Sequence, residues 1–417
     1  MSGGKFNINK LFLFRKKRAG AKNIQRTGAK NFRRVGTKNF RMTNEGSSLE
    51  NRKESPYILR RRNSLFKTER SMPPVSQGEF PFEAQIIAED LNIPWAMDIS
   101  KDGRIYFTER PGTLRMIQNG KLYPEPIMTF REPFTSQGEG GLLGIALDPD
   151  FLQNHFIYVM HTYLEDNQTY NRVIRLIEQD NRAFIDQVLI DRIPGSLVHN
   201  GGRIKIGPDG KLYISTGDAG NTSLPQNLSS TAGKILRIEL DGSIPEDNPF
   251  PGSPVYSYGL RNPQGMAWDP ANNVMYASDH GSEARDEINI IIPGGNYGWP
   301  LVIGDEKSNE LTVQQPLFNT GNATWAPSGI AYLNQGPWEN RLLVATLRGQ
   351  QLVSIPLSEN GTEALSIEPW LQGEYGRLRD VIQANDGSIY LSTSNRDGRG
   401  GVPRPEDDRI IRLIPKS

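Results

Sequence analysis

Six short segments of β-type sequence return along the chain and predict an all-β fold, a six-bladed β-propeller. They are 102–110, 154–162, 209–218, 272–281, 340–349 and 386–395. Each segment alternates polar and apolar side chains, as a half-buried strand does, and lies next to Gly, Asp, Asn or Pro turn residues. The central aromatic or leucine recurs after 52, 55, 63, 67 and 47 residues, a spacing typical of one propeller blade per repeat. The alternative is a β-sandwich of unrelated hairpins, which rarely keeps so regular a count.

The charge distribution divides the chain into two predicted regions. Residues 1–75 hold 20 Lys and Arg against 4 Asp and Glu, a net charge of +16, whereas the remainder carries a net charge of −15. The basic segment contains an octad three times, as RAGAKNIQ, RTGAKNFR and RVGTKNFR, and has too few apolar residues to bury a core. We therefore expect 1–75 to be a disordered tail and 76–417 to form one propeller domain with a large core.

Three interpretations of the basic tail remain open. Its charge can bind nucleic acid or an anionic membrane surface, it can dock on the acidic propeller, or it is a translated upstream stretch with Met72 as the start. Near-exact short repeats often arise from repeated DNA, which favours the last interpretation. The tail therefore does not determine the functional prediction, and no nucleic-acid partner is expected.

The sequence contains no segment that would set the compartment. No stretch approaches the ~18–20 apolar residues of a membrane span, and LFLF at 11–14 is too short for a signal-peptide core. The chain has no Cys, which excludes disulfides, lipid-modified cysteine and thiolate metal sites. The sequence therefore does not indicate the cellular compartment in which the protein works.

A histidine and an aspartate in the third repeat are candidates for acid–base catalysis. His199 stands before a Gly-Gly pair that leaves room for a ligand, and an unperturbed imidazole has a pKa of about 6.5, which suits a general base. Asp218 ends the strand that begins near Lys211, so a hairpin can bring its carboxylate beside His199. The alternative is a surface or structural histidine, the commoner role of a histidine in a loop.

Arginines next to strand ends indicate a ligand with several negative charges. Arg261 and Asn262 precede a proline and present a fork of donors beside an amide, which suits an anionic, carbonyl-bearing ligand. Arg377 and Arg379 are two residues apart, so on a strand they point the same way, and Arg348 follows the fifth repeat. The alternative for Arg261 is a turn in which it pairs with a nearby carboxylate. Together these guanidiniums predict a polyanionic small ligand.

An acidic loop over 278–300 is a candidate calcium site. It carries the carboxylates of Asp279, Glu283, Asp286 and Glu287, followed by a Gly-Gly-Asn-Tyr-Gly turn. Hard oxygen ligands on an irregular loop favour Ca²⁺ over transition metals, although the spacing is not that of an EF-hand. The alternative is a solvated acidic loop without a metal.

Seven motifs between Leu91 and Leu413 resemble a known family, the soluble aldose sugar and glucose/sorbosone dehydrogenases that depend on pyrroloquinoline quinone (PQQ). The motifs are LNIPWAMDISKDGRIYFTER, GEGGLLGIALDPDF, HNGGRIKIGPDGKLYISTGDAG, GLRNPQGMAWDP, DEINIIIPGGNYGWP, APSGIAY and GRLRDVI. The resemblance implies a six-bladed propeller, in agreement with the repeat count, and a cofactor with three carboxylates and an o-quinone, which accounts for the arginines. The implied reaction oxidises the anomeric hydroxyl of an aldose to a lactone and passes electrons to an external acceptor.

The resemblance also implies roles for individual residues. His199 is the general base that takes the proton from the anomeric hydroxyl while hydride passes to the quinone, and Asp218 is the aspartate beside it. The implied cofactor contacts are Glu139, Arg261, Asn262, Arg348, Arg377 and Arg379, of which Arg261 and Asn262 face the quinone oxygens and Arg377 and Arg379 clamp the carboxylates. The implied calcium ligands are the backbone carbonyls of Gly281 and Ser282 near the cofactor, and Glu287 and Tyr297 at a further site.

Three residues depart from the family pattern. Glu139 stands where better-known members have Gln, and a carboxylate near a trianionic cofactor is unfavourable unless Ca²⁺ or Arg offsets it. Arg348 stands where some members have Lys, which keeps the charge but changes the geometry. Val198 precedes His199 where the glucose-specific branch has Asp, and the long substrate-shaping loops of that branch are short in this chain. We therefore expect broad aldose specificity.

Two classes of function remain after the sequence analysis. The leading hypothesis is a calcium- and PQQ-dependent aldose dehydrogenase that acts on free sugars outside the cytoplasm, as its family resemblance implies, as a monomer or homodimer. The alternative is a propeller that keeps the scaffold but binds an anionic ligand or a protein partner without redox turnover. Glu139 is the residue that favours this alternative.

Overall fold

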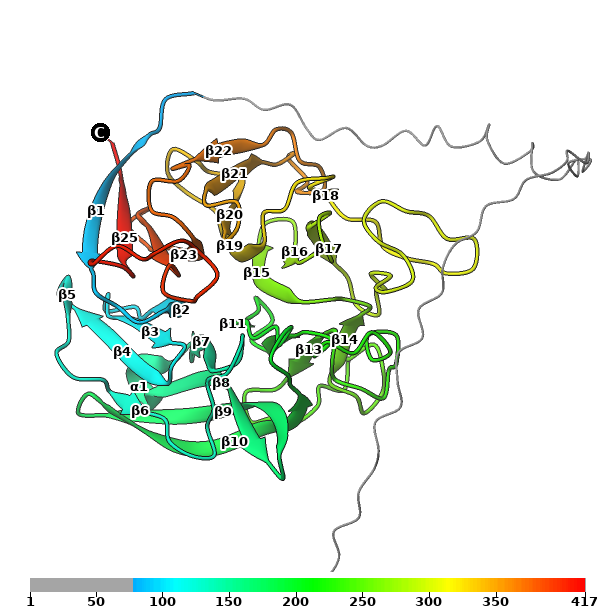
Figure 1. Cartoon of the computed structure of the whole chain (residues 1–417), viewed down its shortest axis with the longest axis horizontal. Coiled ribbons are helices and arrows are strands. Elements are labelled where there is room, and N and C mark those ends of the chain that lie inside the picture. Colours follow the sequence, from blue (N-terminus) through cyan, green and yellow to red (C-terminus); the bar gives the residue numbers. More distant parts are fainter. Residues whose placement is uncertain (1–77, 417) are drawn as a thin grey trace, which may run out of the picture. The chain divides into compact units, whose positions relative to one another are not determined.

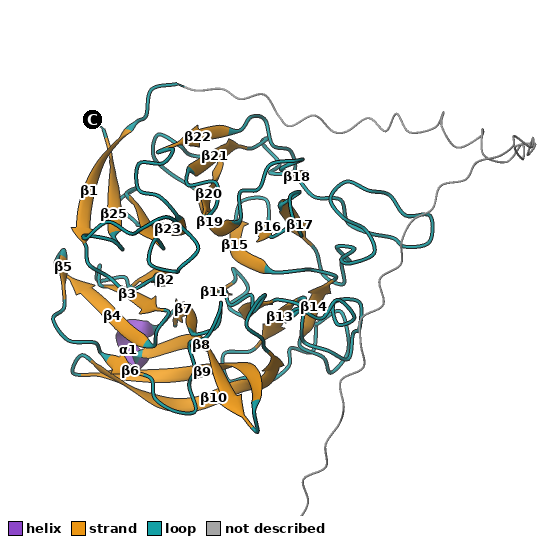
Figure 2. Ribbon diagram, viewed as in Figure 1, coloured by secondary structure: helices purple, strands orange, loops and turns teal. Residues whose placement is uncertain are grey.

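The computed structural model describes residues 78–416, which form six antiparallel sheets arranged as blades around a central axis (Figures 1 and 2). The predicted all-β, six-bladed propeller is therefore confirmed. The basic tail predicted over 1–75, and with it the boundary to the propeller domain, lies outside the described residues. Within 78–416, no helix is long and apolar enough to cross a membrane.

Each blade has four strands, which follow one another from the axis outward. Blade 1 contains β2 (Pro94–Ile99), β3 (Ile105–Glu109), β4 (Thr113–Gln118) and β5 (Lys121–Leu122), with β6 (Met128–Thr129) also paired to β4. Blade 2 contains β7 (Leu142–Leu147), β8 (Phe156–Glu165), β9 (Gln168–Gln179) and β10 (Arg182–Pro194), and the short helix α1 (Phe151–Asn154) joins β7 to β8. Blade 3 contains β11 (Ile204–Ile206), β12 (Leu212–Thr216), β13 (Lys234–Ile238) and β14 (Val255–Tyr258).

The remaining three blades complete the ring. Blade 4 contains β15 (Pro263–Asp269), β16 (Val274–Asp279), β17 (Glu287–Ile291) and β18 (Phe318–Asn319). Blade 5 contains β19 (Pro327–Leu333), β20 (Arg341–Thr346), β21 (Leu352–Pro356) and β22 (Glu368–Trp370). Blade 6 contains β23 (Leu378–Gln383), β24 (Ile389–Thr393), β25 (Ile410–Pro415) and, as its outermost strand, β1 (Phe82–Ala88).

The ring closes by pairing the first strand of the described chain with the last. β1 runs antiparallel to β25, with Phe82 opposite Pro415 and Ala88 opposite Ile410 (Figure 1). Phe82 also packs edge-on against Trp338 of the neighbouring blade, at 4.9 Å between ring centroids. Strands from the two ends of the described residues therefore belong to one sheet, which closes the ring.

The six repeated segments all become the second strand of a blade. Their central residues lie on β3, β8, β12, β16, β20 and β24, namely Tyr106, Tyr158, Tyr213, Tyr276, Leu343 and Tyr390. The expectation of half-buried strands is wrong, however, because every residue of β3 and β12 is buried. The reason is that blades stack face to face, with one apolar cluster between each pair of neighbours.

The polar members of the repeats are buried because they bond to the next blade. In four blades, a hydroxyl side chain lies two residues after the central tyrosine. It donates a hydrogen bond to a backbone carbonyl on the innermost strand of the neighbouring blade. The pairs are Thr108 with Leu143, Ser215 with Pro263, Ser278 with Ser328 and Ser392 with Pro94. A buried hydroxyl that makes a hydrogen bond is tolerated in a core. The polar residues of the alternating pattern therefore face the neighbouring blade and not solvent.

Candidate active site

A histidine–aspartate pair lies where two connections of blade 3 meet near the axis. His199 precedes β11 and adopts a left-handed backbone with φ +55°, while Asp218 follows β12. The close approach requires glycine at 217, because a Cβ there would lie 2.0 Å from the His199 carbonyl oxygen. His199 Nδ1 lies 2.7 Å from Asp218 Oδ1, so the predicted hairpin juxtaposition is confirmed.

The Asp218 carboxylate is buried and uses both oxygens. Oδ2 accepts a hydrogen bond from the Trp299 indole N–H at 2.9 Å, and Oδ1 also accepts the Gly220 backbone N–H at 2.7 Å. Burial opposes ionisation, but the hydrogen bonds from His199, Trp299 and Gly220 outweigh it and hold the pKa of Asp218 below its usual value. An ionised Asp218 only accepts hydrogen bonds, so the proton of the imidazole is held on Nδ1.

Glu139 joins this pair to the other side of the site. Its Oε2 accepts the His199 backbone N–H at 2.7 Å, and its Oε1 lies 2.5 Å from Arg399 Nη1. Burial would raise the pKa of Glu139, but the Arg399 charge and the His199 N–H lower it below the usual value. The charge that set this residue apart in the sequence is therefore offset by an arginine.

The carboxylate of Asp279, at the end of β16, fixes the backbone of the turn formed by Arg261 and Asn262. The two Asp279 oxygens accept the backbone N–H of Arg261 at 2.9 Å and of Asn262 at 2.6 Å, while burial raises the pKa of Asp279 to about 6. The Asn262 side-chain oxygen accepts the Gly201 N–H at 3.0 Å, and the Arg261 guanidinium lies over the Trp299 ring at 5.3 Å. Arg261 and Asn262 therefore adjoin the histidine–aspartate pair.

A cavity beside Glu139 collects four guanidiniums and two carboxylates. The arginines are Arg110, Arg377, Arg379 and Arg399, and the acids are Glu139 and Asp397. Arg377 Nη2 pairs with Asp397 Oδ2 at 2.8 Å, whereas Arg379 bonds the neutral Gln264 side chain at 2.9 Å and lies farther from Asp397 Oδ2, at 3.8 Å. Burial lowers the pKa of Arg379 to about 9. The two arginines that flank the start of β23 therefore line the same cavity, as their spacing predicted.

Several buried guanidinium nitrogens in this region have no partner among residues 78–416. They are the Nε atoms of Arg110, Arg261 and Arg379. A buried donor without an acceptor is costly, so the region fits an anionic ligand that brings acceptors. Arg348, by contrast, is exposed in the loop after β20 and does not line the cavity.

The predicted calcium ligands lie on and after blade 4. Gly281 donates its backbone N–H to Asp286 at 2.9 Å, and Ser282 is exposed. The Glu287 oxygens accept the Gly304 N–H and the Asn289 amide, while the Tyr297 hydroxyl donates to the Ile290 carbonyl. No cluster of three or more metal-ligating side chains occurs between residues 78 and 416, so a calcium site here requires backbone carbonyls.

Sequence reasoning missed five residues of the site. These are Arg110, Asp279 as a backbone clamp, Trp299, Asp397 and Arg399. Trp299 stands inside the Gly-Gly-Asn-Tyr-Gly-Trp-Pro motif and gave a signal through it, but the segment with Asp397 and Arg399 resembles an ordinary polar loop. Only the structure shows that this segment, between β24 and β25 of blade 6, contributes two side chains to the arginine cavity.

Comparison with known proteins finds matches along most of the propeller. A family model described as Glucose / Sorbosone dehydrogenase matches residues 91–410. The chain is 30% identical to the aldose sugar dehydrogenase YliI of Escherichia coli, over 75% of this chain and 90% of that protein. It is 36% identical to the quinoprotein glucose dehydrogenase B of Acinetobacter calcoaceticus, over 64% of each chain. The PQQ-bound aldose sugar dehydrogenase of Streptomyces coelicolor superposes with a TM-score of 0.73 at 37% identity, covering 82% of this chain and all of that structure.

Proposed function

Because the chain belongs to the glucose/sorbosone dehydrogenase family, we propose that it is a PQQ- and calcium-dependent aldose dehydrogenase. It oxidises the anomeric hydroxyl of free aldoses to lactones and passes the electrons to an external acceptor. The observation that carries the proposal is the hydrogen-bonded His199–Asp218 pair beside a cavity with unpaired guanidinium donors.

The acid–base step is assigned to His199. Its Nδ1–H donates to the ionised Asp218, and no described residue hydrogen-bonds to its Nε2. This nitrogen therefore keeps a lone pair that can accept the proton of a sugar hydroxyl. Asp218 stabilises the imidazolium that results, and the Trp299 indole N–H fixes the carboxylate in place.

The cofactor is assigned to the arginine cavity. Four guanidiniums against two carboxylates leave a surplus of positive charge, which suits a ligand with several carboxylates. Arg377 and Arg379 would hold carboxylates, and Arg261 and Asn262 would face the quinone end. When bound, PQQ supplies the two-electron oxidant of the reaction. Arg348 would contribute only after its loop moves, since its side chain is exposed.

Calcium is assigned to the loop after β16. The ligands would be backbone carbonyls of Gly281 and Ser282 near the cofactor, with Glu287 and Tyr297 at a further site. Oxygen donors on an irregular loop match the preference of Ca²⁺. Val198, in place of an acidic residue next to His199, removes one polar sugar contact and favours broad aldose specificity.

The proposal is tested by reconstitution. Purified protein is incubated with PQQ and Ca²⁺, supplied with several aldoses and a dye acceptor, and compared with the same protein without PQQ and with chelator in place of Ca²⁺. We expect dye reduction with more than one aldose only in the complete mixture. Absence of dye reduction with every aldose would overturn the proposal.

A second candidate function is ligand binding without redox turnover. It is favoured by the internal pairs Glu139–Arg399 and Arg377–Asp397, which already neutralise part of the cavity. Calorimetric titration with PQQ separates the candidates. Calcium-dependent binding at micromolar concentration or tighter supports the enzyme, whereas no heat of binding supports the alternative.

A further inference from the structure

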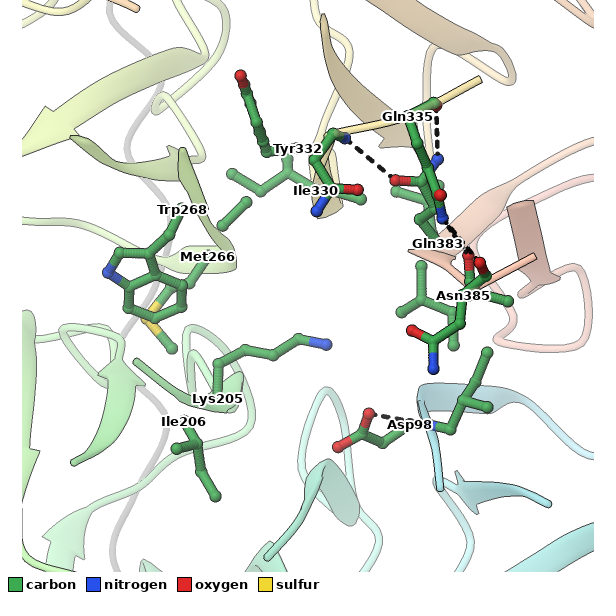
Figure 3. Close-up of a pocket in the computed structure, with 17 residues that line it drawn as sticks. Asp98, Lys205, Ile206, Met266, Trp268, Ile330, Tyr332, Gln335, Gln383 and Asn385 are labelled. Atoms are coloured by element: carbon green, nitrogen blue, oxygen red, sulfur yellow. Dashed lines mark hydrogen bonds between the residues drawn. The ribbon is translucent and has the colours of Figure 1, made fainter. Parts of the chain in front are cut away.

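A second pocket opens at the opposite end of the propeller axis from the candidate active site. The same innermost strands line both: on β15, Gln264 faces the arginine cavity, whereas Met266 and Trp268 line the second pocket. On β23, Arg379 lines the arginine cavity and Gln383 lines the second pocket. The pocket has a volume of about 300 Å³ (Figure 3), which lies within the range of small-ligand sites.

A buried ion pair lies between the two cavities. Arg203 Nη1 is 3.0 Å from Asp380 Oδ2, and both side chains are 1% exposed. Arg203 Nε donates to the Gln264 carbonyl at 2.9 Å, and its guanidinium lies over the Trp95 ring at 4.6 Å. The centre of the axis is therefore filled, and the second pocket is a site of its own.

Lys205 is the one basic side chain among the residues that line the pocket. It lies two residues after Arg203 on β11, so both side chains point toward the axis, and Figure 3 shows the Lys205 ammonium extending into the pocket. Arg203 is neutralised by Asp380, but Lys205 makes no hydrogen bond and no ion pair within 4.0 Å to any residue between 78 and 416. The Lys205 charge acts on Asp98 across the pocket without a direct ion pair, so the half-buried ammonium keeps its hydrogen-bond donors for an anionic ligand.

The one carboxylate in the pocket, Asp98, interacts with the Lys205 charge but makes no ion pair with it within 4.0 Å. Asp98 is bound to the backbone, because its two oxygens accept the N–H groups of Ile99 at 2.9 Å and Leu147 at 2.8 Å. It lies across the pocket from Lys205 in Figure 3. Each oxygen of Asp98 retains a second lone pair, so the carboxylate can still accept a hydrogen bond from a ligand hydroxyl.

The remaining walls are rigid and polar, with one aromatic face. The Gln335 amide donates to the carbonyls of Ala384 and Asn385, and Gln383 donates back to the Gln335 carbonyl, which ties blade 5 to blade 6. The side chain of Asn385 lines the pocket from an exposed loop, and Trp268 lies on the opposite wall (Figure 3). Planar amides, a carboxylate and an indole are the groups that bind hydroxyls and sugar C–H faces.

We propose that this pocket binds a small hydroxylated carboxylate, a sugar acid. The ligand carboxylate pairs with Lys205, its hydroxyls bond to Asp98 and Asn385, and its carbon chain packs on Trp268. A neutral sugar would leave the ammonium unpaired, and a carboxylate without hydroxyls would leave the amide wall unused. The binding is independent of the redox reaction, since it needs neither PQQ nor the arginine cavity.

The test is calorimetric titration of the full chain with D-gluconate, D-glucose and acetate. We expect D-gluconate to bind at least tenfold more tightly than either of the others. Lys205→Met should weaken D-gluconate binding at least tenfold, while Lys121→Met, which removes an exposed charge from β5, should change it less than twofold. This pair also separates the pocket from the arginine cavity, because Lys205 lies beyond the Arg203–Asp380 pair.

Two results would overturn the proposal: unchanged D-gluconate binding by Lys205→Met, or D-glucose binding that is as tight as D-gluconate binding and is weakened equally by Lys205→Met. Circular dichroism checks that the variant folds. If it does not fold, Asn385→Ala on the exposed loop decides the matter. A threefold or greater loss of affinity in that variant supports the site, and an affinity unchanged within twofold refutes it.

Discussion

The two sides of the candidate active site differ in how completely their polar groups are paired. On the histidine side, Asp218 accepts hydrogen bonds at both oxygens and the imidazole is held at Nδ1. On the arginine side, the Nε atoms of Arg110 and Arg379 are buried without a partner among the described residues. The first side comes from two connections of one blade, whereas the second is assembled from loops of several blades. The histidine–aspartate pair is therefore fully hydrogen-bonded within the chain, while the arginine side keeps donors that a ligand could satisfy.

Opening the ring should have the largest effect, because both sides of the site depend on a closed propeller. A truncation through Glu89 removes β1, its pairing with β25 and the packing of Phe82 on Trp338. We expect this protein to be unfolded or to melt far below the full chain. Removing only residues 1–75 leaves β1 intact and should keep both the melting temperature and PQQ affinity. A large loss in the shorter truncation, measured by thermal unfolding, would show that the tail is part of the structure.

Replacing the base tests the histidine side alone. His199→Gln removes the proton acceptor but no charge from the arginine cavity, so turnover should fall about 10²–10⁴-fold while PQQ affinity stays unchanged. Dye-linked turnover and calorimetric titration give the two readouts. His155→Gln, at a half-exposed histidine outside the site, is the matched control. Near-normal turnover of His199→Gln would assign the proton to another group, with Asp218 and Glu139 next in order.

Replacing an arginine tests the opposite side. Arg379→Met removes one charge-assisted donor, which is worth about 1.5–3 kcal/mol, so PQQ should bind roughly 10- to 100-fold more weakly. Stability should not fall, because burial already disfavours the charged form of Arg379. The exposed Arg131→Met is the control. Lost stability with unchanged PQQ affinity would make Arg379 a structural residue and remove the contrast between the two sides.

The fold could be predicted from the sequence because the same pattern of strand and turn residues recurs six times. Each blade contributes the same strand with the same turn chemistry, and ring closure follows from the position of the segment that became β1. The histidine side could also be predicted, since His199 and Asp218 are 19 residues apart on one hairpin. The burial of both faces of the repeated strands was not predicted, because alternation does not show whether a hydroxyl such as Ser215 faces water or the next blade.

The arginine side was only partly predictable. Arg377 and Arg379 flank the start of β23 and line the same cavity, so their spacing carried the signal. Glu139 and Arg399 are 260 residues apart and meet through the order of the blades. No local pattern relates them, and only the three-dimensional arrangement shows that the acidic residue has a basic partner. Contacts between distant blades are therefore the part of the site that requires a structure.

The last expected effect is a loss of stability at acid pH, which we assign to a histidine buried in blade 2. His161 on β8 is 1% exposed and packs against the rings of Phe130 and Phe134. Its Nε2 accepts a hydrogen bond from Arg172 Nε at 2.9 Å, which requires a neutral ring. Burial and the Arg172 charge lower the pKa of His161 to about 4.

The sign of the effect follows from that lowered pKa. The unfolded chain binds a proton at His161 below about pH 6.5 and the folded chain only near pH 4, so stability is full above pH 6.5 and is lost as pH falls through this window. His161→Gln keeps a neutral acceptor for Arg172 and should lose about 2 kcal/mol less than the parent between pH 7.5 and pH 5. Urea unfolding of both proteins at the two pH values measures the difference, in which all other titrating groups cancel. Parallel losses would mean that His161 is not the acid-sensitive group of the fold.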